Sequence, residues 1–229
     1  MDLPIDDKEI ATIVNTMDLG GDISLHQELQ LKHRGYIVID NFFTDKMAKY
    51  LFDTALSEKY VNYDYPNGYK SSDFDKKNSS RSVDGARMNS AFINQIRKKL
   101  PFLKEKKYDR SWSFVYNTVS DGVPIHADDP LKITVTVWVT PDECIFDTTK
   151  NGLIIFKKYA KLNWEMKSYN NGEDVVINDY VEGSEYVRIP YKFNRAIIFP
   201  GKTFHKTDSV HTKPGRNNRR VNYTFLFDN

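Results

Sequence analysis

The sequence predicts a mainly β protein in which N-terminal helices pack on a β-sandwich or barrel core. Helical periodicity of apolar residues is confined to the first part of the chain, up to about residue 105. From about residue 110 onward, short runs of β-branched and aromatic residues alternate with Gly, Pro and Asp turn signals. Hydrophobic residues make up 40% of the chain, with 14 Tyr and 14 Phe, which is enough for a substantial core.

The N-terminal part begins with two helical patterns and a strand. Apolar side chains recur at helical spacing over residues 7–18, which predicts an amphipathic helix that Gly20-Gly21 ends. Residues 24–34 indicate a second helix with a polar face. Residues 35–40 are rich in β-branched side chains and predict a short strand.

Two further helices are expected before the β-core. Thr44 is a suitable N-cap for a helix over residues 45–57. Another helix begins at Asn89 or Ser90 and ends before Pro101, because proline lacks the backbone N–H that a helix interior needs.

Two long segments show little periodicity. Residues 59–85 hold many Tyr and Ser among charges, so we predict a long loop, either a lid over a site or an ordinary surface loop. Residues 159–185 interrupt the later strands, and there we expect a short helix from Leu162 to Tyr169 followed by a polar loop.

Short strands fill the remainder of the chain. Turn signals such as Asn151-Gly152 and Pro200-Gly201 separate them. The expected strands cover residues 110–117, 131–139, 152–157, 186–190, 194–199, 204–208 and 220–227. No internal repeat or linker divides the chain, so we expect one domain over 1–229, helix-rich over 1–105 and a β-core over 106–229.

The composition excludes several classes of function. A formal net charge of +2, from 33 basic and 31 acidic residues, argues against a nucleic-acid-binding groove and against a surface attracted to membranes. No apolar run approaches the roughly 20 residues that span a bilayer. The acidic N-terminus does not resemble a signal peptide, and the single cysteine, Cys144, favours a reducing compartment. A cytoplasmic location is therefore expected, and the oligomeric state is left open.

The first candidate for chemistry is the segment His126-Ala127-Asp128. In an extended chain, residues i and i+2 point to the same side, so the imidazole and the carboxylate can converge on one metal ion. A lone His-x-Asp arises by chance in many chains, because a surface histidine beside a solvated aspartate is common. The pair therefore needs a further ligand to be convincing.

His205 is the preferred third ligand. It directly follows an apolar strand and the tight turn Pro200-Gly201, so it begins a new strand that can lie beside the His126 segment. Two histidines and one carboxylate cover one face of an octahedral iron(II) and leave three positions open. His211 remains an alternative, since its spacing to Arg220 is shorter, although its polar surroundings predict a loop.

Arg220 indicates an anionic ligand. On the last strand, Arg220, Asn222 and Thr224 share the face opposite to that of the apolar residues. An arginine that points into a barrel needs an anion, because a buried unpaired charge is costly, and a dicarboxylate cosubstrate would supply it. The alternatives are a solvent-facing strand end, or a one-residue bulge that would exchange Arg220 with Arg219.

These motifs, in this order, resemble the iron(II)- and 2-oxoglutarate-dependent oxygenases, in particular the prolyl-4-hydroxylase-like branch. The resemblance covers roughly residues 35–229 and includes a segment similar to that of bacterial and phage members. It is carried by the stretches GYIVIDNFFTDKMAKYLFDTA, DGVPIHADDP, ITVTVWVTPDE, GLIIFKKYAKLNWEMKSYN, YKFNRAIIFPGKTFHKTD and NNRRVNYTFLF.

The resemblance implies a double-stranded β-helix (a jelly roll, cupin-like core) with iron held by His126, Asp128 and His205. It also implies that 2-oxoglutarate chelates the iron and meets Arg220 through its distal carboxylate. The resemblance also places Tyr116 near the cosubstrate, because the prolyl-hydroxylase branch has a tyrosine at this position. Strand alternation points Thr134, Thr136 and Thr224 inward, although each of these four is as readily an ordinary strand residue.

The reaction implied is hydroxylation of a C–H bond with dioxygen, coupled to release of succinate and carbon dioxide, with ascorbate as a reductant. Related halogenases lack the carboxylate ligand, so the presence of Asp128 favours hydroxylation. The substrate is expected to be a peptidyl proline, an amino acid or a small metabolite. Candidate entrance residues are Tyr60, Tyr63, Tyr65, Arg87 and Trp112.

Two other classes of protein fit part of the pattern. A non-catalytic jelly-roll binding protein would keep the apolar strand faces but would not need all four polar residues together. A cupin-type metalloenzyme that does not use 2-oxoglutarate would not need Arg220 to point inward.

Overall fold

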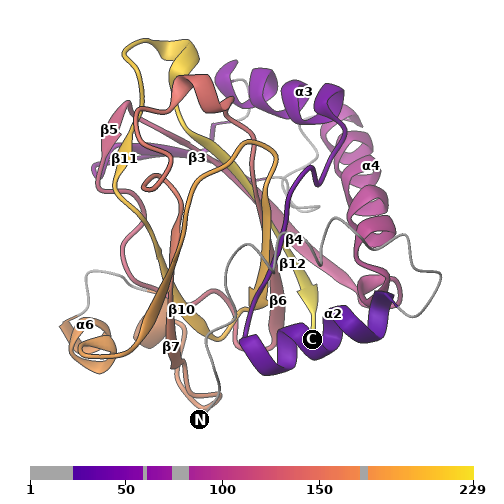
Figure 1. Cartoon of the computed structure of the whole chain (residues 1–229), viewed down its shortest axis with the longest axis vertical. Helices are drawn as coiled ribbons and strands as arrows, with labels where there is room; N and C mark the ends of the chain where they lie inside the picture. Colours follow the sequence, from indigo (N-terminus) through magenta and orange to yellow (C-terminus); the bar gives the residue numbers. More distant parts are fainter. Residues whose placement is uncertain (1–22, 59–60, 74–82, 171–174) are drawn as a thin grey trace.

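The fold is built on a seven-stranded antiparallel sheet to which both halves of the chain contribute (Figure 1). The computed structural model describes residues 23–58, 61–73, 83–170 and 175–229, and the helix expected over 7–18 lies outside them. The strand order is β1-β9-β6-β12-β4-β3-β2. These strands are β1 (Ile37–Ile39), β2 (Tyr63–Tyr65), β3 (Tyr69–Asp73), β4 (Tyr108–Tyr116), β6 (Lys132–Trp138), β9 (Ala196–Pro200) and β12 (Val221–Asp228).

Five further strands among the described residues form a second layer that faces the inner side of this sheet. They are β7 (Leu153–Tyr159), β8 (Tyr186–Ile189) and β10 (Thr203–Thr207), in the order β10-β7-β8, and the pair β5 (Val119–Ser120) and β11 (Val210–His211). Trp138, Ile197 and Phe199 of the large sheet are buried against Leu153 and Ile155 of β7. The two layers form the expected double-stranded β-helix.

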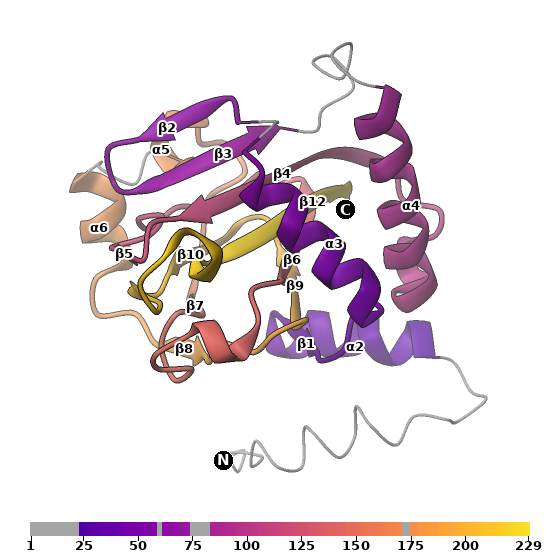
Figure 2. The same cartoon turned by 90° about the horizontal axis from the view of Figure 1, so that it is seen from above.

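Three helices cover the outer face of the large sheet, as Figure 2 shows from above. They are α2 (Ile23–Arg34), α3 (Asp45–Leu56) and α4 (Val83–Lys99). The short 3-10 helices are η2 (Pro101–Leu103), η3 (Asp142–Cys144) and η4 (Arg216–Asn218). Thr44 caps α3 as predicted, since its side chain accepts a hydrogen bond from the Met47 amide at 3.3 Å. No helix among the described residues is long and apolar enough to cross a membrane.

Strand alternation decides what each side of the large sheet contacts. Val135 and Phe225 point to the helices and belong to the main hydrophobic core. Thr136 and Thr224, one residue away, face the space between the two sheets. The two-faced last strand that the sequence predicts is therefore confirmed.

An ion-pair group joins the strand β1 to the turn that enters β9. Asp40 accepts hydrogen bonds from Arg195 Nε at 2.6 Å and from Lys192 Nζ at 2.7 Å. Burial acts to raise the pKa of Asp40, but the hydrogen bonds and positive charges of these two partners outweigh it and hold the pKa below its ordinary value.

The loop predicted over 59–85 is wrong for most of its described residues, while residues 59–60 and 74–82 lie outside the described part of the chain. Residues 63–73 form the β2–β3 hairpin, and α4 begins at Val83 rather than at residue 89 or 90. The hairpin turns at Pro66-Asn67-Gly68, where Gly68 has a φ of 82°, a conformation that glycine adopts without steric cost.

The segment 159–185 also differs from the prediction. Its expected helix is reduced to α5 (Lys167–Asn170), and the expected polar loop contains α6 (Val175–Val181). Ile177 and Val181, four residues apart, bury α6 against a cluster that includes Phe204. Such β-branched residues favour strands in isolation, so burial here overrides local preference.

Candidate active site

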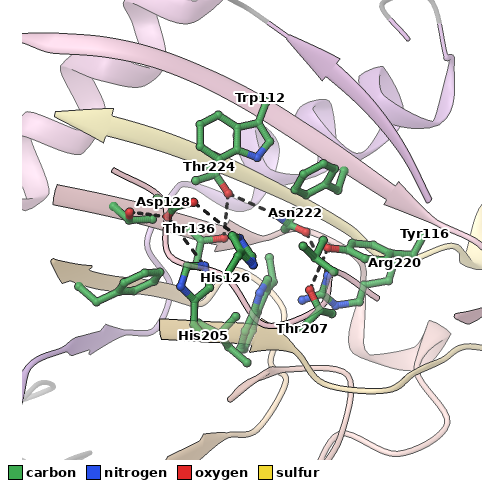
Figure 3. A pocket seen from close by; sticks show the side chains of 16 residues that line it. Trp112, Tyr116, His126, Asp128, Thr136, His205, Thr207, Arg220, Asn222 and Thr224 are labelled. Carbon is green, nitrogen blue, oxygen red and sulfur yellow. Dashed lines mark hydrogen bonds and ion pairs between the residues drawn. The ribbon is translucent and has the colours of Figure 1, made fainter. Parts of the chain in front are cut away.

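A small cavity lies between the two sheets (Figure 3). Side chains from β4, β6, β10 and β12 line it, together with the segment that contains His126 and Asp128. The residues at its two ends differ in chemistry, because two histidines and an aspartate lie at one end and an arginine lies at the other.

At one end, backbone pairing brings His126 beside His205. The His126 amide donates to the His205 carbonyl at 3.0 Å, and the His205 amide donates to the His126 carbonyl at 2.8 Å. The Asp128 amide donates to the Gly201 carbonyl at 2.9 Å, which fixes this segment to the turn before β10. The sequence-predicted trio is thus brought together by main-chain contacts.

The side chains of the trio converge on one point. His126 Nε2 lies 3.7 Å from Asp128 Oδ1, and His205 Nε2 lies 3.8 Å from Asp128 Oδ2. One donor atom from each residue falls within 4.8 Å of the others. Two imidazoles and a carboxylate in this arrangement could hold one face of a divalent metal ion.

Hydrogen bonds fix the orientation of these groups. His126 Nδ1 lies 2.8 Å from the Pro124 carbonyl, and His205 Nδ1 lies 2.9 Å from the Thr203 carbonyl. A carbonyl only accepts, so each Nδ1 donates and each Nε2 presents its lone pair to the shared point.

The protonation of His205 suits this arrangement. Burial, helped by the neighbouring His126 ring, lowers the pKa of His205 to about 4, so the imidazole is neutral at neutral pH. Thr134 Oγ1 donates to Asp128 Oδ2 at 2.6 Å and restricts rotation of the carboxylate.

His211, the alternative third ligand, lies elsewhere. It belongs to β11, its side chain is exposed, and its ring lies 4.8 Å from that of Phe146. It is not part of the cluster formed by the other two histidines and Asp128. The geometry therefore favours His205.

At the other end of the cavity, Arg220 is buried with a relative exposure of 1%. Its guanidinium lies 4.7 Å from the ring centre of Tyr116 and 5.6 Å from that of Trp138. A third ring, that of Tyr191, lies at 5.8 Å. No carboxylate of the described residues lies within ion-pair distance of Arg220, so its charge lacks a protein counter-ion.

The hydrogen bonds that Arg220 makes within the protein do not use all of the N–H groups of its guanidinium. Nε donates to the Asn151 carbonyl at 2.6 Å, Nη1 to Asn222 Oδ1 at 3.0 Å and Nη2 to the Gly152 carbonyl at 3.5 Å. A guanidinium has five N–H groups, so these three bonds leave one on each terminal nitrogen, and the Tyr116 hydroxyl lies near enough to interact with the guanidinium. Two donors on neighbouring nitrogens form a fork that could bind the two oxygens of one carboxylate.

Hydroxyl groups accompany this fork. Tyr116 Oη lies 3.1 Å from Thr207 Oγ1, and both side chains line the cavity. Burial raises the pKa of Tyr116, despite the nearby charge of Arg220, so the phenol keeps its proton. Thr207 was missed in the sequence, although its position two residues after His205 on one strand indicates the same face.

Polar side chains join the two ends of the cavity. Asn222 Nδ2 donates to Thr224 Oγ1 at 3.4 Å, and Thr224 Oγ1 donates to Thr136 Oγ1 at 3.4 Å. In Figure 3 these residues lie between Arg220 and the trio. Asn222 was not assigned a role from the sequence, although the alternation that links Arg220 to Thr224 includes it.

Arg219 does not enter the cavity. Its guanidinium forms an ion pair with Glu58, and its carbonyl accepts a hydrogen bond from Thr140 Oγ1 at 3.0 Å. The bulge that would exchange the two arginines is therefore absent at this described position.

A wider groove opens from the end of the cavity that holds His126 and Asp128. The β2–β3 hairpin forms one wall with Tyr63 and Tyr65, Trp112 of β4 lies between groove and cavity, and Met166 lines the groove too. The predicted entrance residue Arg87 belongs to α4, with its side chain outside the described part, and Tyr60 lies outside the described residues.

The sequence matches no protein-family model and no curated protein. Solved structures with similar folds are numerous. A prolyl-4-hydroxylase from Pseudomonas putida aligns with a TM-score of 0.57 and 10% identity, covering 90% of this chain and 98% of that one.

Two other similar structures have different reactions or ligands. The non-heme α-ketoglutarate-dependent epimerase SnoN from nogalamycin biosynthesis aligns with a TM-score of 0.62 and 11% identity, over 90% of this chain and 82% of that one. HygX from Streptomyces hygroscopicus, solved with nickel and 2-oxoglutarate, aligns with a TM-score of 0.60 and 11% identity, over 89% of this chain and 86% of that one. At such identities the comparison establishes the fold: this chain has the double-stranded β-helix of the iron(II)- and 2-oxoglutarate-dependent oxygenases.

Proposed function

We propose that the protein is an iron(II)- and 2-oxoglutarate-dependent oxygenase that hydroxylates a C–H bond of an organic substrate. One observation carries the proposal. A single cavity has two histidines and a carboxylate at one end, and at the other end a buried guanidinium without a carboxylate partner among the described residues. A metal site alone would not need this arginine.

His126, Asp128 and His205 would hold the iron on one face and leave its other positions to ligands. Bound iron supplies the activation of dioxygen, which is coupled to conversion of 2-oxoglutarate to succinate and carbon dioxide. Thr134 keeps the Asp128 carboxylate in place through its hydrogen bond.

Arg220 would bind the distal carboxylate of 2-oxoglutarate through its two remaining N–H groups. Because the site is buried, water does not compete strongly for these donors. The hydroxyl group of Tyr116 lies at this end of the cavity, and Thr136 and Thr224 line the path toward the metal.

The groove beside the metal end would receive the substrate. Its aromatic wall of Tyr63 and Trp112 offers apolar area with polar edges, which suits either a peptide segment, such as one with proline, or a small metabolite. The presence of a carboxylate ligand, Asp128, favours hydroxylation among the reactions that proteins with this fold catalyse.

Succinate formation from 2-oxoglutarate, with iron(II), ascorbate and dioxygen, tests this function directly. Wild type should form succinate even without substrate, at a slow uncoupled rate, and His126→Ala should not. His211→Ala is the matched control, because it removes a histidine outside the cavity, and it should keep wild-type turnover. Wild type that neither binds iron nor forms succinate would contradict the proposal and favour a binding protein with a jelly-roll fold.

A further inference from the structure

Asn151 is a buried residue with an unusual backbone conformation beside the anion-binding end of the cavity. Its φ is 60° and its relative exposure is 0%. Its own carbonyl accepts the 2.6 Å hydrogen bond from Arg220 Nε. Asparagine tolerates this left-handed region better than most residues, but the conformation still needs support from its surroundings.

The side chain of Asn151 supplies that support. Its Oδ1 accepts from the His211 amide at 2.6 Å, and its Nδ2 donates to the Asp147 carbonyl at 2.9 Å. Both bonds are to backbone atoms, so the side chain connects β11 to the segment before β7. The turn that contains Asn151 and leads into β7 is thereby fixed from two sides.

Gly152 fixes the turn from a third direction. A Cβ at Gly152 would lie 1.9 Å from the Ile189 carbonyl oxygen, so the backbone of the turn lies directly against β8. Two successive carbonyls, those of Asn151 and Gly152, then accept from Nε and Nη2 of the same guanidinium.

The partners of Arg220 in this turn are carbonyl groups, and they affect its charge differently from a carboxylate. They orient the guanidinium through its Nε side, but they carry no net charge, so the full positive charge of Arg220 remains for a ligand. An aspartate in the same place would neutralise the arginine and compete with the incoming carboxylate.

We propose that Asn151 is a positioning residue for the cosubstrate, because its side chain fixes the turn whose carbonyls direct the free fork of Arg220 toward the distal carboxylate of 2-oxoglutarate. The inference rests on the proposed function. It assigns the affinity for 2-oxoglutarate partly to a residue that does not contact this ligand.

Asn151→Gly tests the proposal, because glycine accepts a positive φ without strain and removes only the side chain. The chain offers a matched control in Asn194, which has a φ of 58° and an exposure of 0%. Asn194 Oδ1 accepts from the Phe43 amide at 2.9 Å, and its Nδ2 donates to the Phe43 carbonyl at 2.7 Å. Asn194→Gly therefore also removes one accepted and one donated bond to backbone atoms, at the junction of α3 and β9 and outside the lining of the cavity.

The measurements on both variants are the Kd of 2-oxoglutarate with iron(II) under nitrogen, the Kd of iron(II), the Tm, and the kcat and KM for 2-oxoglutarate. Fluorescence of Trp112 and Trp138, which line the cavity, reports the first titration. We expect Asn151→Gly to raise the Kd of 2-oxoglutarate about tenfold, as loss of a supporting residue commonly does. Iron affinity should stay within about twofold, and turnover should show a higher KM with little change in kcat.

Asn194→Gly should lower the Tm about as much as Asn151→Gly does, because each variant loses two hydrogen bonds to backbone atoms. It should leave the Kd of 2-oxoglutarate within about twofold of the wild-type value. Equal 2-oxoglutarate affinities in wild type and Asn151→Gly would overturn the positioning role. Failure of wild type to bind 2-oxoglutarate at all would instead overturn the proposed function, so the two failures are distinguishable.

A measurement on the wild-type protein covers the case in which Asn151→Gly does not fold. The Nε–H proton of Arg220, assigned by its loss in Arg220→Lys, should exchange slowly with solvent before 2-oxoglutarate is added. Exchange as fast as that of an exposed arginine would show that the Asn151 carbonyl does not hold the guanidinium, and would overturn the inference.

Discussion

Replacement of Arg220 by glutamine removes the positive charge at the buried end of the cavity while keeping a polar side chain. In the structure the guanidinium lies at the buried end of the cavity, and the hydrogen bonds within the protein leave one N–H group on each terminal nitrogen. Glutamine has one amide group and no charge, so it cannot reproduce this pair of donors.

The size of the effect follows from these bonds. A hydrogen bond to a charged group contributes about 1.5–3 kcal/mol. Loss of two such bonds therefore costs about 3–6 kcal/mol, which corresponds to an increase in the Kd of 2-oxoglutarate of at least about a hundredfold. Arg220→Lys keeps the charge but loses the planar fork, so its Kd should lie between those of wild type and Arg220→Gln.

The assay is equilibrium titration of 2-oxoglutarate into the iron(II)-loaded protein under nitrogen, with iron affinity measured separately. Arg219→Gln is the control, because Arg219 pairs with Glu58 and points away from the cavity. It should bind 2-oxoglutarate like wild type. Wild-type affinity in Arg220→Gln, or a large loss in Arg219→Gln, would refute the assignment of the anion site.

Three further substitutions test the metal end and the fold. Thr134→Val removes the 2.6 Å bond to Asp128 with little change in shape, so the Kd of iron(II) should rise about tenfold. Gly201→Ala places a Cβ 2.2 Å from the Asp129 carbonyl oxygen, so chemical denaturation should give an unfolding free energy lower by about 2 kcal/mol or more. Asp40 has a lowered pKa when folded, so its stabilisation is present above its unfolded value of 3.8 and is lost as the pH falls through the folded pKa. Asp40→Asn should therefore flatten the acid limb of the Tm–pH profile.

Each of these outcomes has a contrary result. Unchanged iron affinity in Thr134→Val would mean that the hydrogen bond does not orient Asp128. Wild-type stability in Gly201→Ala would mean that the turn moves freely away from residue 129. A Tm that falls equally steeply below pH 4 in Asp40→Asn and wild type would assign acid sensitivity to other carboxylates.

The last strand shows how much local pattern can predict. Its residues alternate between polar and apolar from Arg220 to Phe225, and the structure has the apolar residues of this stretch on the helices and the polar ones on the cavity. Likewise, the apolar stretch and tight turn around Pro200-Gly201 were enough to predict that His205 follows on a new strand. Both predictions depend on residue patterns within a few positions of the chain, and contacts between distant parts of the chain do not alter such patterns.

The hairpin at residues 63–73 shows what was overlooked. Asn67-Gly68 is a strong turn signal, and Tyr63, Tyr65 and Tyr69 around it are frequent strand residues. Many charges and serines in the same segment concealed this pattern. α6 is a harder case, because Ile177 and Val181 become a helix face only through burial against Phe204, a contact distant in sequence.

The site was predictable to a similar degree. His126 and Asp128 follow from spacing in an extended chain, and the choice of His205 over His211 follows from context. The carbonyl partners of Arg220 were not predictable, since Asn151 and Gly152 are distant in sequence and act through their backbone. Sequence alternation identifies side chains on a shared face, but it does not identify backbone atoms that approach from another strand.

The most direct test of the central claim is a crystal structure of the protein grown under nitrogen with iron(II) and 2-oxoglutarate, with the metal located by anomalous scattering. We predict one iron bonded to His126 Nε2, His205 Nε2 and an oxygen of Asp128, and one 2-oxoglutarate that reaches from this iron to the paired N–H groups of Arg220. Iron at another site, or a 2-oxoglutarate that leaves Arg220 without a carboxylate, would contradict the account.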